Sequence, residues 1–537
     1  MKKYFSLFLI LVLFSCSTKE NKNFLTIAIS EDLSTLNPLF AFSEIENNLS
    51  EMLFVSLVSH KWDASNGKIL SYPMLAKNIE WAEDSTSVTV QLRDDCYWSD
   101  GKPTTSADVV FSYLLFANPK VESKALGYFE NYNLRKDGSI DSSLTFEIFS
   151  DYLFSIKFRK NTKPSFLDID LPILPKHILE KVPLEKLADD IFNQKPVTNG
   201  VYKLKQWKRN QFIELELNSA NFLAREKSIK RIILKIIPDY KSKIMQLQNN
   251  EVDLVEMIEP ENIDDLRKNS NLNVEFIKGR MYDYIGFRNV SSKSDENPFA
   301  DKRLRKAIAL ALDRETIINQ FLKESGELAS GPISPIFKSI IIENTSTISF
   351  NPDSAKSILK KLNYVDSDND GIVEKLGKRL ILNIAIPTGN PRRQFAAKLF
   401  KDNLKQIGID MQINYLEMNA FMDGLFDRKY ESWMLGWGTP IPPNLKVQWF
   451  SDITQTPMNF ADYKNAKVDS MLISIENVKS ESKKTELLSE INKIIIADEP
   501  CIFLYWIDDN IALNSRVKNY SINSLNSMEA IWEWELE

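Results

Sequence analysis

The stretch that most constrains this chain is residues 91–116, QLRDDCYWSDGKPTTSADVVFSYLLF. Apolar and polar residues alternate from 88 to 93, which predicts a half-buried strand. The segment SDGKP that follows is typical of a turn, where Gly101 is free to take a positive φ. Thr105, with Asp108 three residues later, resembles a capping box and predicts the start of a helix. We therefore expect a strand-turn-helix corner that serves as scaffold and does not contact a ligand.

Length and charge restrict the class of protein. A chain of 537 residues predicts roughly three or four domains or lobes. Hydrophobic residues make up 43% and charged residues 26%, which is ordinary for a soluble globular protein. Without residues 1–15 the chain has 65 basic and 73 acidic residues, a net charge of −8. This mildly acidic balance argues against a nucleic-acid partner, which would favour a basic surface.

The N-terminus indicates export. Lys2 and Lys3 precede an apolar run over residues 5–14, which is too short for a permanent membrane span and fits a signal-peptide core. The run ends in Leu-Phe-Ser-Cys, which resembles a bacterial lipobox with Cys16 as the lipidated residue. We expect a signal peptide at 1–15 and a polar tether at 16–23, followed by the folded chain. A plain signal peptide with an incidental cysteine is the alternative.

The exact residues of the stretch at 91–116 restrict the protein family more than its local structure does. LRDD-x-x-WSDGKP followed by DVVFSY closely resembles the signature of the family 5 extracellular solute-binding proteins. A second match, PFADKRLRKAIALALDR, lies at residues 298–314. Shorter matches include LNP at 36–38 and LPKH at 174–177, so the resemblance covers nearly all of residues 24–525. Proteins of this family are receptors of ABC importers for peptides, nickel and related solutes.

The resemblance implies an α/β type II periplasmic-binding fold, a two-lobed clamshell with an extra small inserted domain, giving three lobes. Lobe I would comprise residues 24–62, 171–285 and 497–537, lobe II residues 63–170, and lobe III residues 286–496. It also implies a monomer, lipid-anchored in the periplasm or cell envelope through Cys16. Such a protein would bind a peptide in the cleft between its lobes and deliver it to an ABC permease with its ATPase subunits.

The candidate site follows the strand predicted at 430–435. In the peptide-binding branch of the family, GW-x-x-D follows such a strand, and its Asp holds the α-ammonium of the ligand. Gly436 and Trp437 match, but Pro440 occupies the Asp position. Asp423, Asp427 or a loop acid could substitute, or each could be a solvated surface charge. The ligand-facing residues that the resemblance implies are Gly436, Trp437, Gly438, Thr439, Glu44, Glu46, Tyr128 and Tyr505.

The substitution at Pro440 leaves several functions open. A receptor for a non-peptide solute is the second hypothesis, because a buried amine without its partner would be costly. An envelope lipoprotein that acts as a sensor or chaperone is a third. A carboxylate-dependent hydrolase is a fourth, although we expect no enzyme. His60 and His177 are the two histidines, neither lies near a nucleophile motif, and no cofactor motif is present.

Two further features have structural interpretations. Cys96 and Cys501 lie in apolar, strand-like contexts, so we expect two buried free thiols. Residues 366–371, DSDNDG, copy the start of a calcium loop. The position of its bidentate Glu is Gly377, so we favour a tight turn and assign no metal site.

Overall fold

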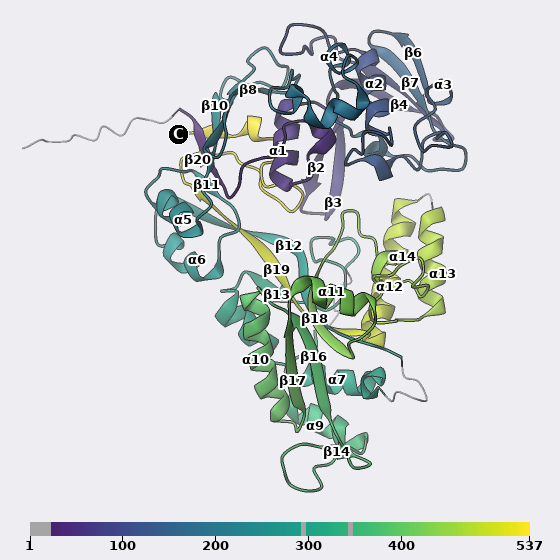
Figure 1. Ribbon diagram of the computed structural model, residues 1–537, viewed down its shortest axis with the longest axis vertical. Coiled ribbons are helices and arrows are strands. Elements are labelled where there is room, and N and C mark those ends of the chain that lie inside the picture. The colour runs from purple at the N-terminus through teal and green to yellow at the C-terminus, as the bar shows by residue number, and fades with distance from the viewer. Residues whose placement is uncertain (1–22, 291–296, 342–346, 479) are drawn as a thin grey trace, which may run out of the picture.

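The computed structural model describes residues 23–290, 297–341, 347–478 and 480–537. The predicted signal peptide, Cys16 and all but the last residue of the predicted tether lie outside the described residues. Within these ranges, no helix combines the length and the apolar character needed to cross a bilayer. The chain forms three lobes of mixed α/β structure, two of them side by side in the upper part of Figure 1 and the third below them.

Two long strands join lobe I to lobe III: β12, Leu272–Phe287, and β19, Cys501–Asn514. They belong to one sheet of order β17-β16-β18-β12-β19-β11-β1-β10-β9-β8. Their pairing shifts register between Ile277 and Met281, and a bulge of this kind lets a strand bend. Residues 281–287, which follow this bulge, pair with β18, and the lobe boundary at residue 285 stays a prediction.

Lobe I is built on β1, whose five residues are all buried and, apart from Thr26, form an apolar run. Such a run is typical of a parallel strand covered on both faces, and β1 pairs in parallel with β10 and β11. The elements of lobe I outside the crossing strands are β1 (Leu25–Ile29), η1 (Pro38–Phe40), α1 (Glu44–Leu53), η4 (Leu184–Asp189), η5 (Ile191–Asn193), β8 (Tyr202–Lys208), β9 (Phe212–Leu217), β10 (Arg231–Ile236), α5 (Tyr240–Gln248), β11 (Leu254–Val255), α6 (Pro260–Arg267), β20 (Val517–Lys518), η8 (Ile531–Glu533) and β21 (Glu535–Leu536).

Lobe II holds the strand-turn-helix corner, with its sheet in the order β4-β5-β7-β6. The capping box is confirmed: the Thr105 N–H donates to the Asp108 carboxylate at 2.9 Å. His177 lies 2.7 Å from Asp100 and thereby links the turn at residues 99–103 to the short helix that contains His177. The elements are β4 (Ala76–Trp81), β5 (Ser87–Leu92), α2 (Ser106–Phe116), η2 (Leu126–Tyr128), α3 (Ser142–Thr145), β6 (Phe146–Ser150), β7 (Leu153–Lys157), η3 (Phe166–Ile169) and α4 (Lys176–Leu179).

A hairpin reaches from the upper lobes to lobe III. Its strands are β2, Val58–Asp63, and β3, Lys68–Pro73, and the Trp62 ring packs edge-on against Phe337. His60 lies 2.9 Å from the Oγ atom of Ser71, its cross-strand neighbour, and 2.9 Å from Asp170. The sequence shows no nucleophile motif near either histidine. Ser71 belongs to no such motif, and it lies beside His60 because the two strands of the hairpin pair.

Lobe III packs helices on both faces of its part of the main sheet. One face carries α7, α9 and α10, and the other α11 to α14 (Figure 1). Its elements are η6 (Pro298–Ala300), α7 (Lys302–Ala311), α8 (Arg314–Thr316), η7 (Ile317–Phe321), β13 (Gly326–Leu328), α9 (Pro352–Lys361), β14 (Glu374–Lys375), β15 (Lys378–Arg379), β16 (Ile381–Pro387), α10 (Pro391–Lys405), β17 (Asp410–Leu416), α11 (Met418–Phe426), β18 (Ser432–Gly438), α12 (Lys446–Trp449), α13 (Ala466–Asn477) and α14 (Glu481–Asp498).

Both cysteines of the described chain are free and buried, as the sequence predicted. Burial raises the pKa of the Cys96 thiol to about 11. The thiolate, which is the reactive form of cysteine, is therefore scarce at neutral pH. Cys96 and Cys501 act as small apolar side chains in two different lobes.

Candidate ligand-binding site

The two halves of the main sheet present their carboxyl edges to each other. In lobe I, β11 runs antiparallel to β19, and in lobe III, β18 runs antiparallel to β12. Because β12 runs from lobe I into lobe III and β19 runs back, β11 points toward lobe III and β18 points toward lobe I. Parallel neighbours follow the same directions, β1 and β10 in one lobe and β16 and β17 in the other. Ligands of open α/β sheets bind outside the carboxyl ends of strands.

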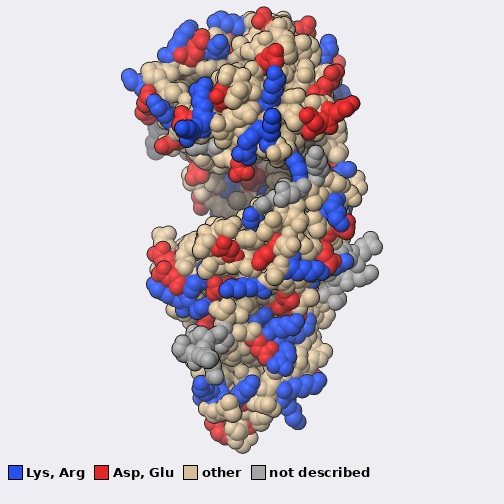
Figure 2. Space-filling model, turned by 90° about the vertical axis from the view of Figure 1, so that its right-hand side faces the viewer, with Lys and Arg blue, Asp and Glu red and all other residues tan. Residues whose placement is uncertain are grey.

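The space between these edges is open. Figure 2 shows a deep hollow between the upper and the lower part of the molecule. A further hollow of about 360 Å³ lies elsewhere, on lobe III, where its lining includes Lys302, Ile358 and Glu499. That lining comes from α7, α9 and the segment after α14, whereas β18 ends at the edge that faces lobe I. We therefore build the site at the end of β18.

Trp437 lies at this end of β18 and is half-buried, packed against the lobe III core but not enclosed by it. It pairs across the sheet with Tyr282, and Gly436 pairs with Asp283. A Cβ added at Gly436 would collide with Arg393 Nη2, so glycine lets that guanidinium lie against the strand. Because successive strand residues face opposite sides of the sheet, the Arg393 guanidinium lies on the α10 face at Gly436, and the Trp437 side chain packs toward the opposite face.

The next two residues differ from each other in accessibility. Gly438 is exposed and pairs with Met281, whose sulfur a Cβ at this position would crowd. Thr439 is buried: its N–H donates to the Arg280 carbonyl at 2.9 Å, and its hydroxyl donates to the Pro332 carbonyl at 3.3 Å. The Thr439 side chain thus anchors the loop, and we do not retain it as a direct ligand contact.

Asp283 is the electrostatic centre beside this strand. Its carboxylate is fully buried, 2.8 Å from Arg392 Nε and 3.0 Å from Arg393 Nε. Burial alone would raise the pKa of Asp283, but the charges of Arg392 and Arg393 hold it below the ordinary value. The acid is therefore ionised at neutral pH and fixes both guanidinium groups at the first turn of α10.

Tyr505, which the resemblance placed among ligand-facing residues, lies instead in the core. Its ring is fully buried, and its hydroxyl lies 3.3 Å from Asp283 Oδ2. Burial, with the Asp283 charge beside it, raises the pKa of Tyr505 well above its ordinary value. We correct its role to a support for Asp283, because a strand residue that faces the lobe III core cannot also face the cleft.

Glu46 is also a structural residue. Its side chain caps α1 with Ser43 and accepts hydrogen bonds from the backbone N–H groups of Ser34, Thr35 and Phe42. The Ser34 hydroxyl donates to the same carboxylate. Glu46 is 5% exposed and its oxygens are occupied, so it is not available to hold a ligand amine.

Replacing Glu46 by glutamine should lower the free energy of unfolding by about 2 kcal/mol, because buried N–H donors lose a charged acceptor. Chemical denaturation measures this change. Glu44→Gln is the matched control, since Glu44 begins the same helix but is exposed, and it should leave stability nearly unchanged. Loss of ligand affinity in Glu46→Gln at unchanged stability would contradict the structural role.

Other acids gather where lobe I meets the crossing strands. Glu256 directly follows β11, and burial followed by the nearby Glu44 raises its pKa. Asp509 of β19 has a raised pKa for the same reasons, while Arg280 opposes the rise. Of these acids, the resemblance had pointed only to Glu44. Tyr128, on η2 of lobe II, is 72% exposed. Glu44 and Tyr128 remain accessible candidates for ligand contact.

Pro440, which takes the position of the amine-binding Asp in the resemblance, brings no charge to the end of β18. Pro440 is exposed, and the two substitutes suggested from lobe III, Asp423 and Asp427, are exposed on α11 and at its end. Asp427 pairs with Lys429 at 2.8 Å. Both acids therefore belong to the solvated surface of the helix.

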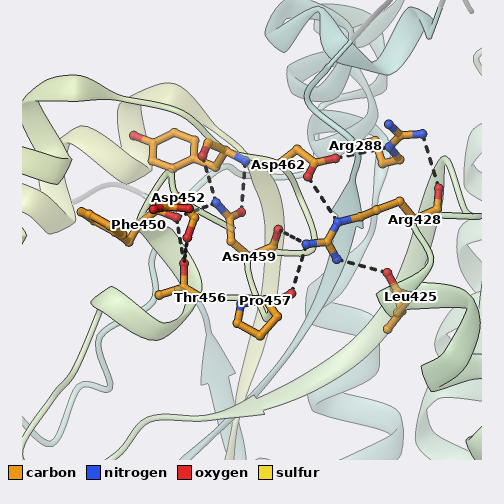
Figure 3. Close-up of polar contacts among 10 residues, drawn as sticks. Arg288, Leu425, Arg428, Phe450, Asp452, Thr456, Pro457, Asn459 and Asp462 are labelled. Carbon is orange, nitrogen blue, oxygen red and sulfur yellow. Dashed lines mark hydrogen bonds and ion pairs between the residues drawn. The ribbon is translucent and has the colours of Figure 1, made fainter. Parts of the chain in front are cut away.

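A polar network sets the register of β18 against β12. Asp462 lies 3.4 Å from Arg288 Nε, just after β12, and 3.2 Å from Arg428 Nε, just before β18 (Figure 3). Arg428 also donates to the Pro457 and Asn459 carbonyls, and these hydrogen bonds hold the loop at residues 457–459. The network holds the end of β12 to the start of β18, at the opposite end of β18 from Trp437.

The acidic side chains of the turn at residues 366–374 in lobe III lie close together. Asp366, Asp368, Asp370 and Glu374 bring carboxylate oxygens within 4.8 Å of one another. Glu374 closes the group, whereas the sequence prediction considered Gly377 as the closing position. The oxygens accept from the turn's own backbone, as in Gly371 N–H to Asp366 at 3.0 Å, and Arg379 lies 3.0 Å from Asp370. These contacts fit a tight turn, and we assign no metal to it.

Sequence reasoning missed Asp283, Arg392 and Arg393. A signal for the arginines was present: Asn390 caps α10, Pro391 follows, and the helix begins directly after β16. That placement puts its first turn at the carboxyl edge of the sheet. Asp283 gave no signal of its own, because it lies in a strand far from both arginines in the sequence.

Comparisons with known proteins agree with this architecture. The family model of bacterial extracellular solute-binding proteins, family 5 Middle, matches residues 71–455. The oligopeptide-binding protein AppA of Bacillus subtilis is 26% identical over 505 residues, covering 93% of this chain and 89% of AppA. The structure of that AppA with a nonapeptide has a TM-score of 0.65 at 25% identity, covering 96% and 99%.

A second solved structure shares the fold. NikZ from Campylobacter jejuni, solved in complex with Ni(L-His), has a TM-score of 0.68 at 24% identity, covering 96% of this chain and 99% of NikZ. The family match covers most of the chain, and the cleft, the crossing strands and the three lobes are in place. The chain therefore belongs to the bacterial extracellular solute-binding proteins of family 5.

Proposed function

We propose that this protein is the extracytoplasmic receptor of an ABC importer, and that it binds peptides in the cleft between lobe I and lobe III. It would deliver them to a membrane permease as a monomer that is tethered to the cell envelope by a lipid on Cys16. The similarity to AppA, named for oligopeptide binding, supports the peptide ligand. The proposal includes no chemical change of the ligand.

The observation that carries the proposal is the opposition of two carboxyl edges across an open cleft, linked by the bulged strands β12 and β19. A ligand between these edges contacts both lobes in a closed form and one lobe in an open form. Closure is then a population shift, driven by the difference in affinity between the two forms. Half-buried Trp437 would stack on the ligand at the lobe III edge.

Charge at the two edges also supports a peptide. Glu44, Glu256 and Asp509 gather on the side of lobe I, and Arg392 and Arg393 lie on the side of lobe III. A peptide with a free amine and a free carboxylate is a zwitterion that matches this polarity. The residues we propose for ligand contact are Trp437, Gly436, Gly438, Glu44 and Tyr128.

The second candidate is a receptor for a solute that is not a peptide. Pro440 favours it, because the lobe III edge lacks a carboxylate for an amine at that position. The two candidates differ in the ligand that stabilises the fold.

Thermal unfolding in the presence of peptide pools of defined length tests the function. Binding at about hundredfold excess over Kd should add about 2.7 kcal/mol to the free energy of unfolding. Trp437→Ala should remove most of this gain, whereas Trp207→Ala, an aromatic change on β8 of lobe I, should keep it. If no peptide length stabilises the protein, the peptide version is wrong, and mass spectrometry of a copurified solute would support the second candidate.

A further inference from the structure

Lobe III contains a hollow of about 230 Å³ at the end of β19 that is farther from lobe I. Its walls include α7, the start of α8, the end of α14 and the first residues of β19. A cavity of about 10–15 Å³ already holds one water molecule, so this one has room for a polyatomic ion. The charged side chains in its lining are Arg305, Lys306, Arg314 and Glu499. The proposed function uses none of them.

The two arginines of this lining are buried. Arg305 is 4% exposed and Arg314 is 3% exposed, and burial lowers the pKa of each to about 10. Both are therefore still charged at neutral pH. Their hydrogen bonds to the described residues all go to backbone carbonyls, which are dipoles without net charge. The carbonyls are those of Phe299, Ala300, Asp498 and Glu499 for Arg305, and of Ala329, Ile348 and Phe503 for Arg314.

The lining carries a net positive charge. Its one acid, Glu499, pairs with Lys306 at 2.8 Å. Glu315, which follows Arg314 in the sequence, is exposed to water. In the part of the chain that the structure describes, no carboxylate forms an ion pair with Arg305 or Arg314, although buried charges usually have such a partner. Three cations and one anion leave a charge of +2 around the hollow.

Two further acids lie near Arg305, and both have other partners. Asp301 pairs with Arg303 at 2.7 Å. The Asp498 carboxylate accepts from the Tyr463 hydroxyl at 2.7 Å and from the Asn465 amide at 2.8 Å. Neither acid lines the hollow. The positive charge of the lining is therefore not balanced from behind its walls by a free carboxylate.

Hydrogen-bond donors remain for a ligand in the hollow. A guanidinium group carries five N–H donors. Arg305 makes four hydrogen bonds to carbonyls, and Arg314 makes three through its Nη1 and Nη2 atoms. Ser330 and Thr347 add hydroxyl groups to the lining. The hollow thus offers donors from several elements of lobe III.

The hollow of about 360 Å³ on the same lobe adjoins this one, because both are lined by Lys306, Ala497 and Glu499. A concentration of positive charge at an entrance raises the local concentration of anions. The outer hollow therefore gives an anion an approach toward the buried arginines. The basic side chains that the outer hollow adds are Lys302, Arg303 and Lys361.

We propose that the hollow between α7 and α14 binds a small inorganic oxyanion, such as sulfate or phosphate, through Arg305, Lys306 and Arg314. An ion of charge −2 balances the lining, and its several oxygens match donors that come from separate elements. Guanidinium groups and oxyanions form charge-assisted hydrogen bonds, which are stronger than neutral ones. The ion joins α7, α14 and the start of β19 and does not enter the cleft, so the inference does not depend on the solute of the proposed function.

Titration of the full chain with sulfate, measured by isothermal calorimetry in chloride buffer at constant ionic strength, tests the inference. One saturable site is expected, and phosphate should compete for it. Lys306→Gln should weaken sulfate binding at least about tenfold, because it removes one cation and leaves Glu499 without its partner. Arg314→Lys should also weaken it, since lysine lacks the planar fork of the guanidinium. Lys467→Gln, which breaks an exposed pair with Glu490, is the matched control and should keep the wild-type affinity.

Crystals soaked with selenate test the position of the ion, because selenium gives an anomalous signal. A selenate peak in the hollow, beside Arg305 and Arg314, is the expected result, and peaks that lie only elsewhere would overturn the inference. The absence of saturable binding by both sulfate and phosphate would overturn it as well. So would equal sulfate affinity of the wild type and Lys306→Gln, and this comparison decides if Arg314→Lys does not fold.

Discussion

Replacing Asp283 by asparagine should lower the free energy of unfolding by about 3–5 kcal/mol. The substitution leaves Arg392 and Arg393 without an anion at a site where the carboxylate itself is not exposed. Loss of one partner is more costly than the net worth of an ion pair, because the remaining charges stay buried. Urea unfolding of the two proteins measures the difference. Asp427→Asn, which breaks an exposed pair with Lys429, should cost at most about 1 kcal/mol.

The same residue predicts a dependence on pH. The native pKa of Asp283 lies below its unfolded value, so the folded protein binds this proton less readily than the unfolded chain. Its stabilisation is complete above the unfolded pKa of about 3.9 and is lost as pH falls through the lower native pKa. The difference in stability between wild type and Asp283→Asn should therefore shrink in acid. A difference that stays constant down to strongly acidic pH would contradict the ionised, doubly paired state.

Replacing Gly279 by alanine should cost about 3 kcal/mol, the upper part of the usual range for overpacking. Gly279 is buried in the bulge where β12 crosses between lobes, and a Cβ there would collide with the Ile507 carbonyl oxygen. The Gly279 carbonyl also accepts from the Ser334 hydroxyl at 2.9 Å, which restricts its escape. Because the clash is with backbone, a change of rotamer cannot relieve it, and the bulge itself must shift.

Thermal and chemical denaturation measure the cost of the Gly279 change. The control is Gly127→Ala, since a Cβ at Gly127 meets no atom within 4 Å and its φ is not positive. That control should keep stability within about 0.5 kcal/mol. A Gly279→Ala protein as stable as wild type would mean that the crossing strands tolerate rearrangement and do not form a defined hinge.

Features with a local cause were predicted well from the sequence. The Thr105–Asp108 capping box and the Asn351-Pro352 start of α9 depend on neighbouring residues, and both form. The sequence pattern also predicts a helix over residues 48–57, but α1 begins at Glu44, because Ser43 and Glu46 form a capping box. The local signal for this start, Ser43 followed three residues later by Glu46, is present in the sequence.

Features that depend on distant pairing were not predictable in the same way. The apolar pattern predicts a closing strand over residues 500–506, yet β19 continues to Asn514. Its polar run Asp508, Asp509 and Asn510 interrupts the apolar pattern because it lies where the strand passes between lobes. The family resemblance placed Tyr505 at the cleft, and alternation alone does not say which face of a strand meets the core. Only the pairing with Asp283 resolves it.

The central claim, that two lobes close around a solute, is tested most directly by a distance between them. Spin labels on Lys160→Cys in lobe II and Ser474→Cys in lobe III, with Cys16 replaced by serine, give this distance by pulsed electron paramagnetic resonance. Both positions are exposed, and the native Cys96 and Cys501 are buried. A saturating peptide pool should shift the distances to a shorter, narrower population. Tight binding that leaves the distance distribution unchanged would contradict closure of the lobes around the ligand.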